Sequence, residues 1–188
     1  MSKNIMIVGV GGQGTLLASR ILGNVILKEG YDVKLSEVHG MSQRGGSVVT
    51  YVKYGDEVYS PIIEEGEADI ILAFEMLEAY RAMSYLKKDG IMIANTQKID
   101  PIPVITGAAK YPENIEEKIK EKLNLIAVDA RKLAMEAGNI KAVNVVLIGI
   151  MAKNTPIEYD KWIEALKETV PAKLLEVNLK AFDLGYNL

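Results

Sequence analysis

The 188-residue chain contains no cysteine and only one histidine, His39. Without cysteine it forms no disulfide and no thiolate-ligated zinc or iron–sulfur centre, and it has no cysteine nucleophile. Carboxylates are then the main remaining metal ligands. A cluster of acidic residues precedes a predicted strand, but it lacks the spacing of a calcium-binding loop: Glu64, Glu65, Glu67 and Asp69. We therefore expect no metal site in this chain and interpret the acidic group as a solvated edge before a strand.

Long apolar runs and an excess of basic charge are also missing. The longest apolar run, residues 145–152, is far shorter than the roughly 20 residues that span a bilayer. The N-terminus has neither the length nor the cleavage pattern of a signal peptide. The 22 Lys and Arg are balanced by 25 Asp and Glu, for a net charge of −3, whereas a nucleic-acid-binding domain normally carries a basic patch. We expect a cytoplasmic protein that binds neither membrane nor nucleic acid.

The remaining composition is that of an ordinary globular domain. Hydrophobic residues make up 49% of the chain and charged residues 25%. A chain of this length buries roughly 70% of its unfolded surface and needs no covalent cross-link to fold. No internal repeat, low-complexity segment or linker divides it, so we expect a single domain that covers residues 1–188.

Apolar runs alternate with amphipathic segments over the first two thirds of the chain. Residues 4–10 are apolar almost without interruption, which is typical of a strand in a parallel sheet that is covered on both faces. Further strands are predicted at 32–37, 48–54, 68–74, 91–94 and 125–128. Helices are predicted at 13–29, 75–88, 113–123, 129–138 and 144–153, followed by two amphipathic helical stretches.

The order of these elements predicts an α/β fold that is Rossmann-like and doubly wound, with a mostly parallel sheet and a helical C-terminal third. One departure from simple alternation is expected. Gly55 and Asp56 form a turn after the strand at 48–54, and Val58 and Tyr59 are expected to return beside that strand as a β-hairpin insertion.

A glycine-rich turn is predicted between the first strand and the first helix. Its glycines fit the pattern G-x-G-x-x-G in the strand–turn–helix context that this motif requires. A helix N-terminus offers free N–H groups and the positive end of a dipole, so the turn is a candidate site for a phosphate. The candidate cofactor-binding residues are Gly9, Gly11, Gly12, Gln13, Gly14 and Thr15. A tight turn that binds nothing is the alternative.

A second polar, glycine-rich segment lies at the end of the second strand. It combines the only histidine with an acid and an arginine, and we interpret it as a loop that binds a ligand or a partner: Glu37, His39, Gly40, Ser42, Gln43, Arg44, Gly45, Gly46 and Ser47. Arg44 offers planar donors for a carboxylate or a phosphate, but arginine is also enriched at protein interfaces. Glu37 stands 23 residues after Gly14, near the position expected of a ribose-binding acid.

His39 has two interpretations. A lone histidine is more often a hydrogen-bonded structural residue than a catalyst, so His39 is only a candidate for catalysis. A nucleophilic triad of Ser42, His39 and Glu37 is disfavoured, because residues so close on one loop rarely converge and no G-x-S-x-G elbow is present. In a doubly wound fold both glycine segments would lie at the carboxyl ends of neighbouring strands, where such folds bind ligands.

Together, the two segments resemble a known family. The first reads Gly9-Val10-Gly11-Gly12-Gln13-Gly14, and the second reads Ser-Glu-Val-His-Gly-Met-Ser-Gln-Arg-Gly-Gly-Ser-Val over residues 36–48. Both are similar to the gamma-type domain of 2-oxoacid:ferredoxin oxidoreductases, and the resemblance covers nearly the whole chain. Pyruvate-type members commonly have a glutamate before Arg-Gly-Gly, whereas the form found here favours the indolepyruvate branch.

The resemblance implies a small subunit that works with a large (alpha) subunit. In that family the large subunit holds thiamine diphosphate and iron–sulfur clusters, and this chain fits the small role because it has no cysteine and no Gly-Asp-Gly motif. The assembly would decarboxylate an aryl 2-oxoacid oxidatively to an acyl-CoA and pass electrons to ferredoxin in anaerobic metabolism. This chain would contact coenzyme A or substrate through its glycine segments, with Arg44 as the anion anchor and His39 as a polar or proton-bearing neighbour.

Two other functions stay open. One is a stand-alone oxidoreductase that binds NAD(P) or FAD at the first glycine turn, and the other is a purely structural scaffold subunit. As a subunit, the isolated chain is expected to be inactive, to expose an apolar surface that its partner normally covers, and to form a homodimer when the partner is missing.

Overall fold

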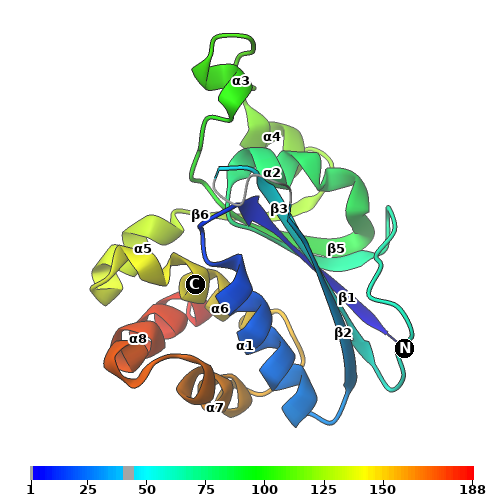
Figure 1. The fold of residues 1–188 in the computed structure, drawn as a ribbon, viewed down its shortest axis with the longest axis vertical. Helices are drawn as coiled ribbons and strands as arrows, with labels where there is room; N and C mark the ends of the chain where they lie inside the picture. Colours follow the sequence, from blue (N-terminus) through cyan, green and yellow to red (C-terminus); the bar gives the residue numbers. More distant parts are fainter. Residues whose placement is uncertain (1, 40–44) are drawn as a thin grey trace.

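The computed structural model of the protein describes residues 2–39 and 45–188, which include a six-stranded sheet with helices on both faces (Figure 1). The strand order is β2-β3-β1-β4-β5-β6. The strands are β1 (Lys3–Val10), β2 (Asp32–His39), β3 (Ser47–Gly55), β4 (Ala68–Ala73), β5 (Leu86–Asn95) and β6 (Asn124–Val128). β1, β4, β5 and β6 run parallel, whereas β3 is antiparallel to both of its neighbours, β1 and β2.

Helices cover the two faces of the sheet unequally. One face carries a layer made of α1 and the C-terminal helices α5 to α8, and the other carries α2 and α4. The helices are α1 (Thr15–Lys28), α2 (Met76–Arg81), α3 (Ile102–Ile105), α4 (Ile115–Lys120), α5 (Ala130–Ala137), α6 (Val143–Lys153), α7 (Tyr159–Thr169) and α8 (Leu175–Tyr186), with 3₁₀ turns η1 (Met83–Tyr85), η2 (Ile140–Ala142) and η3 (Ala172–Leu174). The α/β architecture and the helical C-terminal third agree with the sequence prediction.

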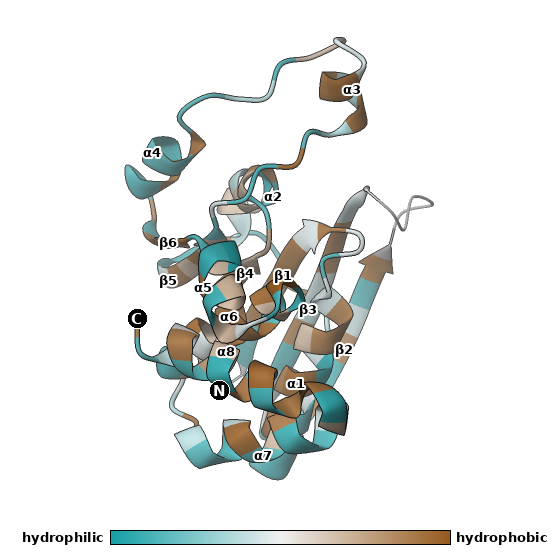
Figure 2. Ribbon diagram, turned by 90° about the vertical axis from the view of Figure 1, so that its left-hand side faces the viewer, coloured by the Kyte–Doolittle hydropathy of each residue, from teal (hydrophilic) through white to brown (hydrophobic). Residues whose placement is uncertain are grey.

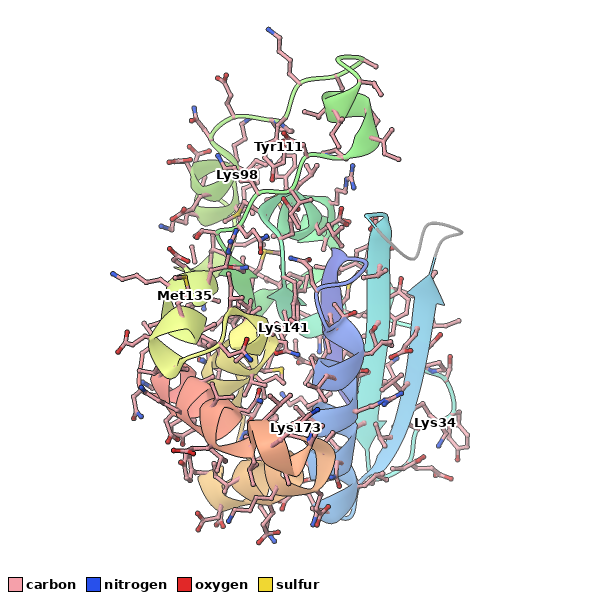
Figure 3. The ribbon with its side chains drawn as sticks, turned by 60° about the vertical axis from the view of Figure 1, so that its left-hand side comes forward. Lys34, Lys98, Tyr111, Met135, Lys141 and Lys173 are labelled. Carbon is pink, nitrogen blue, oxygen red and sulfur yellow. The ribbon has the colours of Figure 1, made fainter. Side chains whose placement is uncertain are left out.

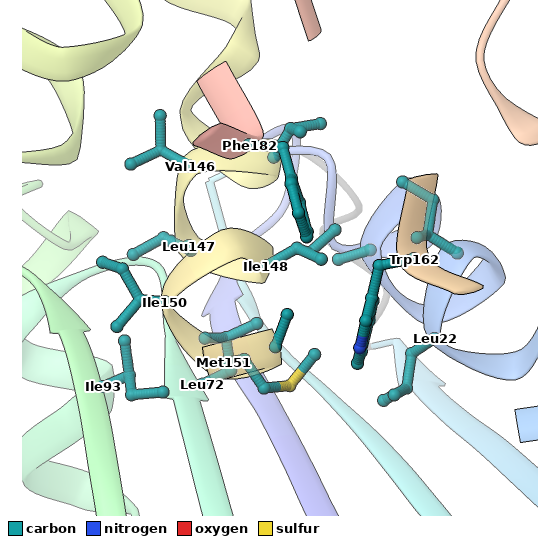
Figure 4. Packing of buried hydrophobic residues seen from close by; sticks show 14 of the residues in the cluster. Leu22, Leu72, Ile93, Val146, Leu147, Ile148, Ile150, Met151, Trp162 and Phe182 are labelled. Atoms are coloured by element: carbon teal, nitrogen blue, oxygen red, sulfur yellow. The ribbon is translucent and has the colours of Figure 1, made fainter. Parts of the chain in front are cut away.

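Helix α6 lies at the centre of the larger core (Figure 4). It is apolar on every side, and its residues from Asn144 to Ala152 are all buried, as the sequence predicted. Glycines let α6 and α8 approach closely: a Cβ at Gly149 would lie 2.2 Å from the carbonyl oxygen of Phe182, and one at Gly185 would lie 2.1 Å from that of Val146. Within the described residues, no helix is both long and apolar enough to cross a bilayer.

Helix α5 begins and ends at the residues that the sequence indicated. The Asp129 carboxylate caps its N-terminus by accepting a hydrogen bond from the backbone N–H of Lys132 at 3.0 Å. Gly138 ends the helix in a left-handed conformation, with φ of 112°. These two signals are local, which is why sequence alone located both ends.

The predicted hairpin between 48–54 and Val58–Tyr59 is wrong. The hairpin is formed instead by β2 and β3, which pair along their whole lengths, from Asp32 opposite Gly55 to His39 opposite Val48. The other edge of β3 pairs with β1, so no edge of β3 is left for a further strand. Residues 57–60 contain no strand, and the N–H of Val58 donates to the side chain of Asp32 at 2.9 Å.

The helix predicted at 75–88 is also shorter than expected. α2 ends at Arg81, the turn η1 follows, and β5 begins at Leu86 rather than at residue 91. Leu86 is buried and pairs with Ala68 of β4, and the ammonium of Lys87 donates to Asp69 at 2.8 Å. Pairing with β4 therefore overrides the helical pattern of residues 86–88, which is common where local propensity and tertiary contacts compete.

Candidate functional site

The carboxyl ends of several strands meet at one edge of the sheet. β1, β4, β5 and β6 are parallel, and β2 has the same direction because β3 is antiparallel to both β1 and β2. The segments that follow these strands therefore lie along a single edge. In doubly wound folds this is the edge where ligands bind, next to the point where successive connections pass to opposite faces.

The two glycine segments are hydrogen-bonded to each other at this edge. The N–H of Gly11 donates to the carbonyl of Gly46 at 2.9 Å, and the N–H of Gly45 donates to the carbonyl of Gly11 at 3.4 Å. The expectation that the segments lie together is confirmed for these residues. The expectation that their strands are neighbours is wrong, because β3 lies between β1 and β2.

Gln13 fastens the first glycine turn to the sheet. Its side-chain oxygen accepts a hydrogen bond from the N–H of Val10 at 2.7 Å, and its side-chain nitrogen donates to the carbonyl of Phe74 at 2.9 Å. The amide thus bridges the ends of β1 and β4. A Cβ at Gly9 would lie 2.9 Å from both the Gln13 oxygen and the Cβ of Phe74, so glycine is required at this position for packing alone.

The start of α1 is packed against α6. Gly14 precedes the helix with φ of 84°, a left-handed conformation, and a Cβ there would lie 2.8 Å from the side-chain nitrogen of Asn144. That nitrogen donates to the Gly14 carbonyl at 3.4 Å. Gly12 also has a left-handed backbone, with φ of 100°, but open space surrounds its Cβ position. Thr15 is the first residue of α1 and is buried.

The second segment is described only at its two ends. Glu37 on β2 accepts a hydrogen bond from the Ser19 hydroxyl of α1 at 2.9 Å. The backbone of His39 pairs with Val48, and its side chain lies outside the described part of the structure. The predicted residues Gly40, Ser42, Gln43 and Arg44 also lie outside it.

Ser47 connects the second segment to α2. Its hydroxyl donates to one carboxylate oxygen of Glu78 at 2.5 Å, and the Arg81 guanidinium donates to the other oxygen at 2.6 Å. Glu78 is buried, whereas the side chain of Arg81 is half exposed. The buried carboxylate therefore has partners on both oxygens, and the guanidinium remains accessible at the edge of the sheet.

A pocket of about 560 Å³ opens beside the first glycine turn. Backbone of the turn forms one wall, and the segments after β5, β6 and α5 form the rest: Gly12, Gln13, Gly14, Gln97, Arg131, Ile140, Lys141, Val143 and Asn144. Arg131 and Lys141 are both exposed, and none of the described residues that line the pocket is acidic. Two cations, three amide side chains and a glycine backbone are a combination suited to a phosphate.

Two buried polar residues at the same edge were missed by the sequence analysis. Asn95, at the end of β5, donates to the carbonyl of Phe74 at 3.2 Å and accepts from the N–H of Ala130 at 3.2 Å, which ties three strand ends together. Glu75 lies two residues after the end of β4 and is 1% exposed. A polar residue that directly follows a predicted apolar strand is the signal that would have indicated both.

Glu75 organises the segment that follows β5. It accepts hydrogen bonds from the N–H of Glu78 at 2.9 Å, the N–H of Ile99 at 3.0 Å and the hydroxyl of Tyr111 at 2.6 Å. Burial and the bond to Glu75 raise the pKa of the Tyr111 hydroxyl well above its ordinary value. Residues 2–38 and 45–188 contain no group of three or more acidic residues that is arranged to hold a metal ion.

The doubly wound sheet and the paired glycine segments define an α/β domain whose candidate site lies at the carboxyl edge of the sheet. A family model described as pyruvate ferredoxin/flavodoxin oxidoreductase matches residues 4–188. The chain belongs to this family, as a gamma-type small subunit of an oxidoreductase complex, and the family predicted from the sequence is confirmed.

Individual relatives agree with this assignment. The indolepyruvate oxidoreductase subunit IorB of Pyrococcus horikoshii is 49% identical over 188 residues, which cover 97% of this chain and 93% of that protein. The gamma subunit of a keto/oxoacid ferredoxin oxidoreductase from Geobacter sulfurreducens has the same fold, with a TM-score of 0.73 at 23% identity over 98% of this chain and 96% of that chain.

The same fold also occurs inside a longer polypeptide. The 2-oxoglutarate:ferredoxin oxidoreductase of Magnetococcus marinus, solved with 2-oxoglutarate, coenzyme A and succinyl-CoA bound, matches 99% of this chain with a TM-score of 0.76 and 18% identity. The match covers 30% of that chain. The α/β fold class predicted from the sequence is thus shared with solved proteins.

Proposed function

We propose that this chain is the small subunit of an indolepyruvate-type 2-oxoacid:ferredoxin oxidoreductase in the cytoplasm, working as one domain over residues 1–188. The assembly would convert an aryl 2-oxoacid and coenzyme A to an acyl-CoA and carbon dioxide, and two electrons would pass to ferredoxin. The observation that carries the proposal is the full-length match to the indolepyruvate oxidoreductase subunit at 49% identity.

The division of labour follows from the residues present. Iron–sulfur clusters require thiolates, and this chain has no cysteine, so a large (alpha) subunit would hold the clusters together with thiamine diphosphate. Those groups supply the decarboxylation and electron-transfer chemistry when bound to that subunit. The isolated small subunit would then have no activity of its own.

The contribution of this chain would be to bind an anionic part of coenzyme A. The first glycine turn exposes its backbone at Gly12, and the neighbouring pocket carries the cations Arg131 and Lys141. Coenzyme A bears phosphates, which such a site favours over neutral ligands. In this proposal Arg44 adds a further cation from the second glycine segment, and His39 is a polar neighbour.

The anion-binding role is tested by replacing both cations of the pocket. We expect the double variant Arg131→Ala and Lys141→Ala, in the complex reconstituted with its large subunit, to raise the KM for coenzyme A about tenfold or more, because each lost charge-assisted hydrogen bond contributes roughly 1.5–3 kcal/mol. The KM for the 2-oxoacid should not change. The matched control is Lys173→Ala, which removes an exposed cation on η3, outside the pocket (Figure 3). An unchanged KM for coenzyme A in the double variant would contradict the proposal.

One observation counts against a stand-alone dinucleotide-dependent enzyme. Glu37 lies on β2, which is separated from β1 by β3, whereas the ribose-binding acid of that class lies on the strand beside the first. Micromolar binding of NAD(H), NADP(H) or FAD by the purified chain would restore this alternative.

A further inference from the structure

A segment of unusual composition projects from the edge of the sheet that carries the glycine segments. We call residues 96–112, between β5 and α4, the arm; it contains the four-residue helix α3 and extends beyond the rest of the molecule (Figure 1). The nine residues from 101 to 109 include no charged side chain, although a quarter of the chain is charged. The arm is therefore an exposed segment whose central part carries no charge, which is unusual for a surface of this protein.

The tip of the arm exposes two large aliphatic side chains. Ile102 and Ile105 are 66% and 71% exposed, more than any other isoleucine in the described residues. Figure 2 shows α3 as a hydrophobic element at the outer end of the arm, away from the sheet. The apolar surface of each side chain would be removed from water only if another molecule covered it.

The arm is held at both of its roots. One oxygen of the buried Glu75 carboxylate accepts from the N–H of Ile99, at the start of the arm, and from the hydroxyl of Tyr111, near its end. The ammonium of Lys98 lies 5.8 Å from the centre of the Tyr111 ring (Figure 3). Because its roots are fixed before any partner arrives, the arm loses less conformational freedom on binding than a free loop would.

The arm is continuous with the glycine segments. Its residues Ile99, Pro101, Ile102 and Pro103 share a pocket of about 170 Å³ with Gly45, Gly46 and Ser47. A partner that covers the tip of the arm would therefore also reach the second glycine segment. The pocket admits roughly one apolar side chain from such a partner.

We propose that the arm is the docking element for the large subunit, whose complementary surface is an apolar groove that covers Ile102 and Ile105. A second copy of this chain fits the arm less well. Stable interfaces bury about 800 Å² on each partner, from roughly 20–30 residues, and the uncharged part of the arm supplies only nine. A large partner that covers both the arm and the neighbouring glycine segments meets that requirement.

This inference rests on the proposed subunit role and identifies the arm as the place where the large subunit makes contact. The test is the double variant Ile102→Ser and Ile105→Ser, mixed with the large subunit encoded in the same genome, with the dissociation constant measured by titration. Both side chains are exposed, so the isolated variant should keep the circular dichroism and the melting temperature of the parent chain. We expect association to weaken by on the order of tenfold or more.

The matched control is Ile62→Ser. Ile62 is 62% exposed, but it precedes β4 and so lies toward the opposite edge of the sheet. Unchanged affinity in the arm variant, or equal weakening in the control, would overturn the docking role and leave the proposed function intact. An arm variant that abolished self-association of the isolated chain but bound the large subunit normally would assign the arm to a second copy instead. Failure of the parent chain itself to bind the large subunit would overturn both proposals.

Discussion

At the scale of single residues, the first glycine motif is explained by packing before any ligand is considered. A side chain at Gly9 would collide with Gln13 and Phe74, and one at Gly14 would collide with Asn144. Gly11, by contrast, is joined through its backbone to Gly45 and Gly46. The motif therefore has a structural cause at positions 9 and 14, and the ligand-binding role that we propose would fall to the exposed backbone at Gly12.

Substitutions at Gly14 and Gly12 separate backbone strain from collision. We expect Gly14→Ala to destabilise the protein by about 2–3 kcal/mol, because alanine is strained at φ of 84° and its Cβ meets Asn144. Gly12→Ala has the strain without the collision and should cost about 1–2 kcal/mol. Urea denaturation measures both, and equal losses would show that the contact with Asn144 has no effect.

Sequence indicated the site residues only where they are local in the chain. Gly9 to Gly14 and Glu37 to Ser47 are recognisable as short patterns, and the structure brings their described parts together. The contact between Gln13 and Phe74 spans 61 residues and that between Asn144 and Gly14 spans 130, so no local pattern predicts either. Arg131 follows the last strand, and the strand-end rule applied to β6 would have indicated it.

At the scale of elements, strand direction was the main feature that the sequence analysis missed. The pattern of apolar residues located β3 but does not encode its direction. The length of the connection indicates the direction instead. The seven residues from 40 to 46 are too few for the crossover of a dozen or more residues that a parallel pair of strands requires. The short glycine-rich connection thus predicts the antiparallel hairpin of β2 and β3, and with it the separation of β2 from β1.

Replacement of glycine by alanine should have opposite effects on stability at Gly149, where α6 contacts α8, and at Gly23 on α1. Gly149→Ala should cost about 3 kcal/mol or more, because its Cβ would lie 2.2 Å from a backbone oxygen of α8 that cannot move without moving the helix. Gly23→Ala on α1 meets no atom within 4 Å and should stabilise the protein by up to about 1 kcal/mol. Thermal and chemical denaturation compare the two, and a stable Gly149→Ala variant would refute the close packing.

At the scale of the whole molecule, two apolar cores lie on opposite faces of the sheet. The larger one joins the sheet to α1 and the C-terminal helices, and the smaller one joins it to α2 and α4. The fold class was predictable because continuous apolar strands and amphipathic helices alternate along the chain. Ile102 and Ile105 of the arm are exposed, and the docking that we propose would cover them.

The tyrosines should report the integrity of the fold at high pH. Burial raises the pKa of Tyr54 to about 12, and a hydrogen bond to Asp183 raises that of Tyr159 to about 12. The folded state therefore favours the neutral hydroxyls, and this stabilisation is complete below about pH 10 and is lost as the pH rises through 12.

Absorbance at 295 nm, followed as the pH is raised, measures the prediction. Tyr54 and Tyr159 should ionise in a late step, about two units above the ordinary tyrosine pKa of about 10 or together with alkaline unfolding. Tyr159→Phe should reduce the amplitude of the late step by one tyrosine. A single transition near pH 10 in a chain that keeps its circular dichroism would contradict the assigned environments.

The close packing of α6 against α8 also has a consequence for folding during synthesis. α6 is apolar on all sides, and α8 (Leu175–Tyr186), the helix that covers its outer surface, comes later in the sequence. During synthesis the hydrophobic helix α6 emerges from the ribosome before α8 has been made. The main core therefore closes only after residues 175–186 have been synthesised, and a chain truncated before α8 would leave that core open to chaperones and proteases.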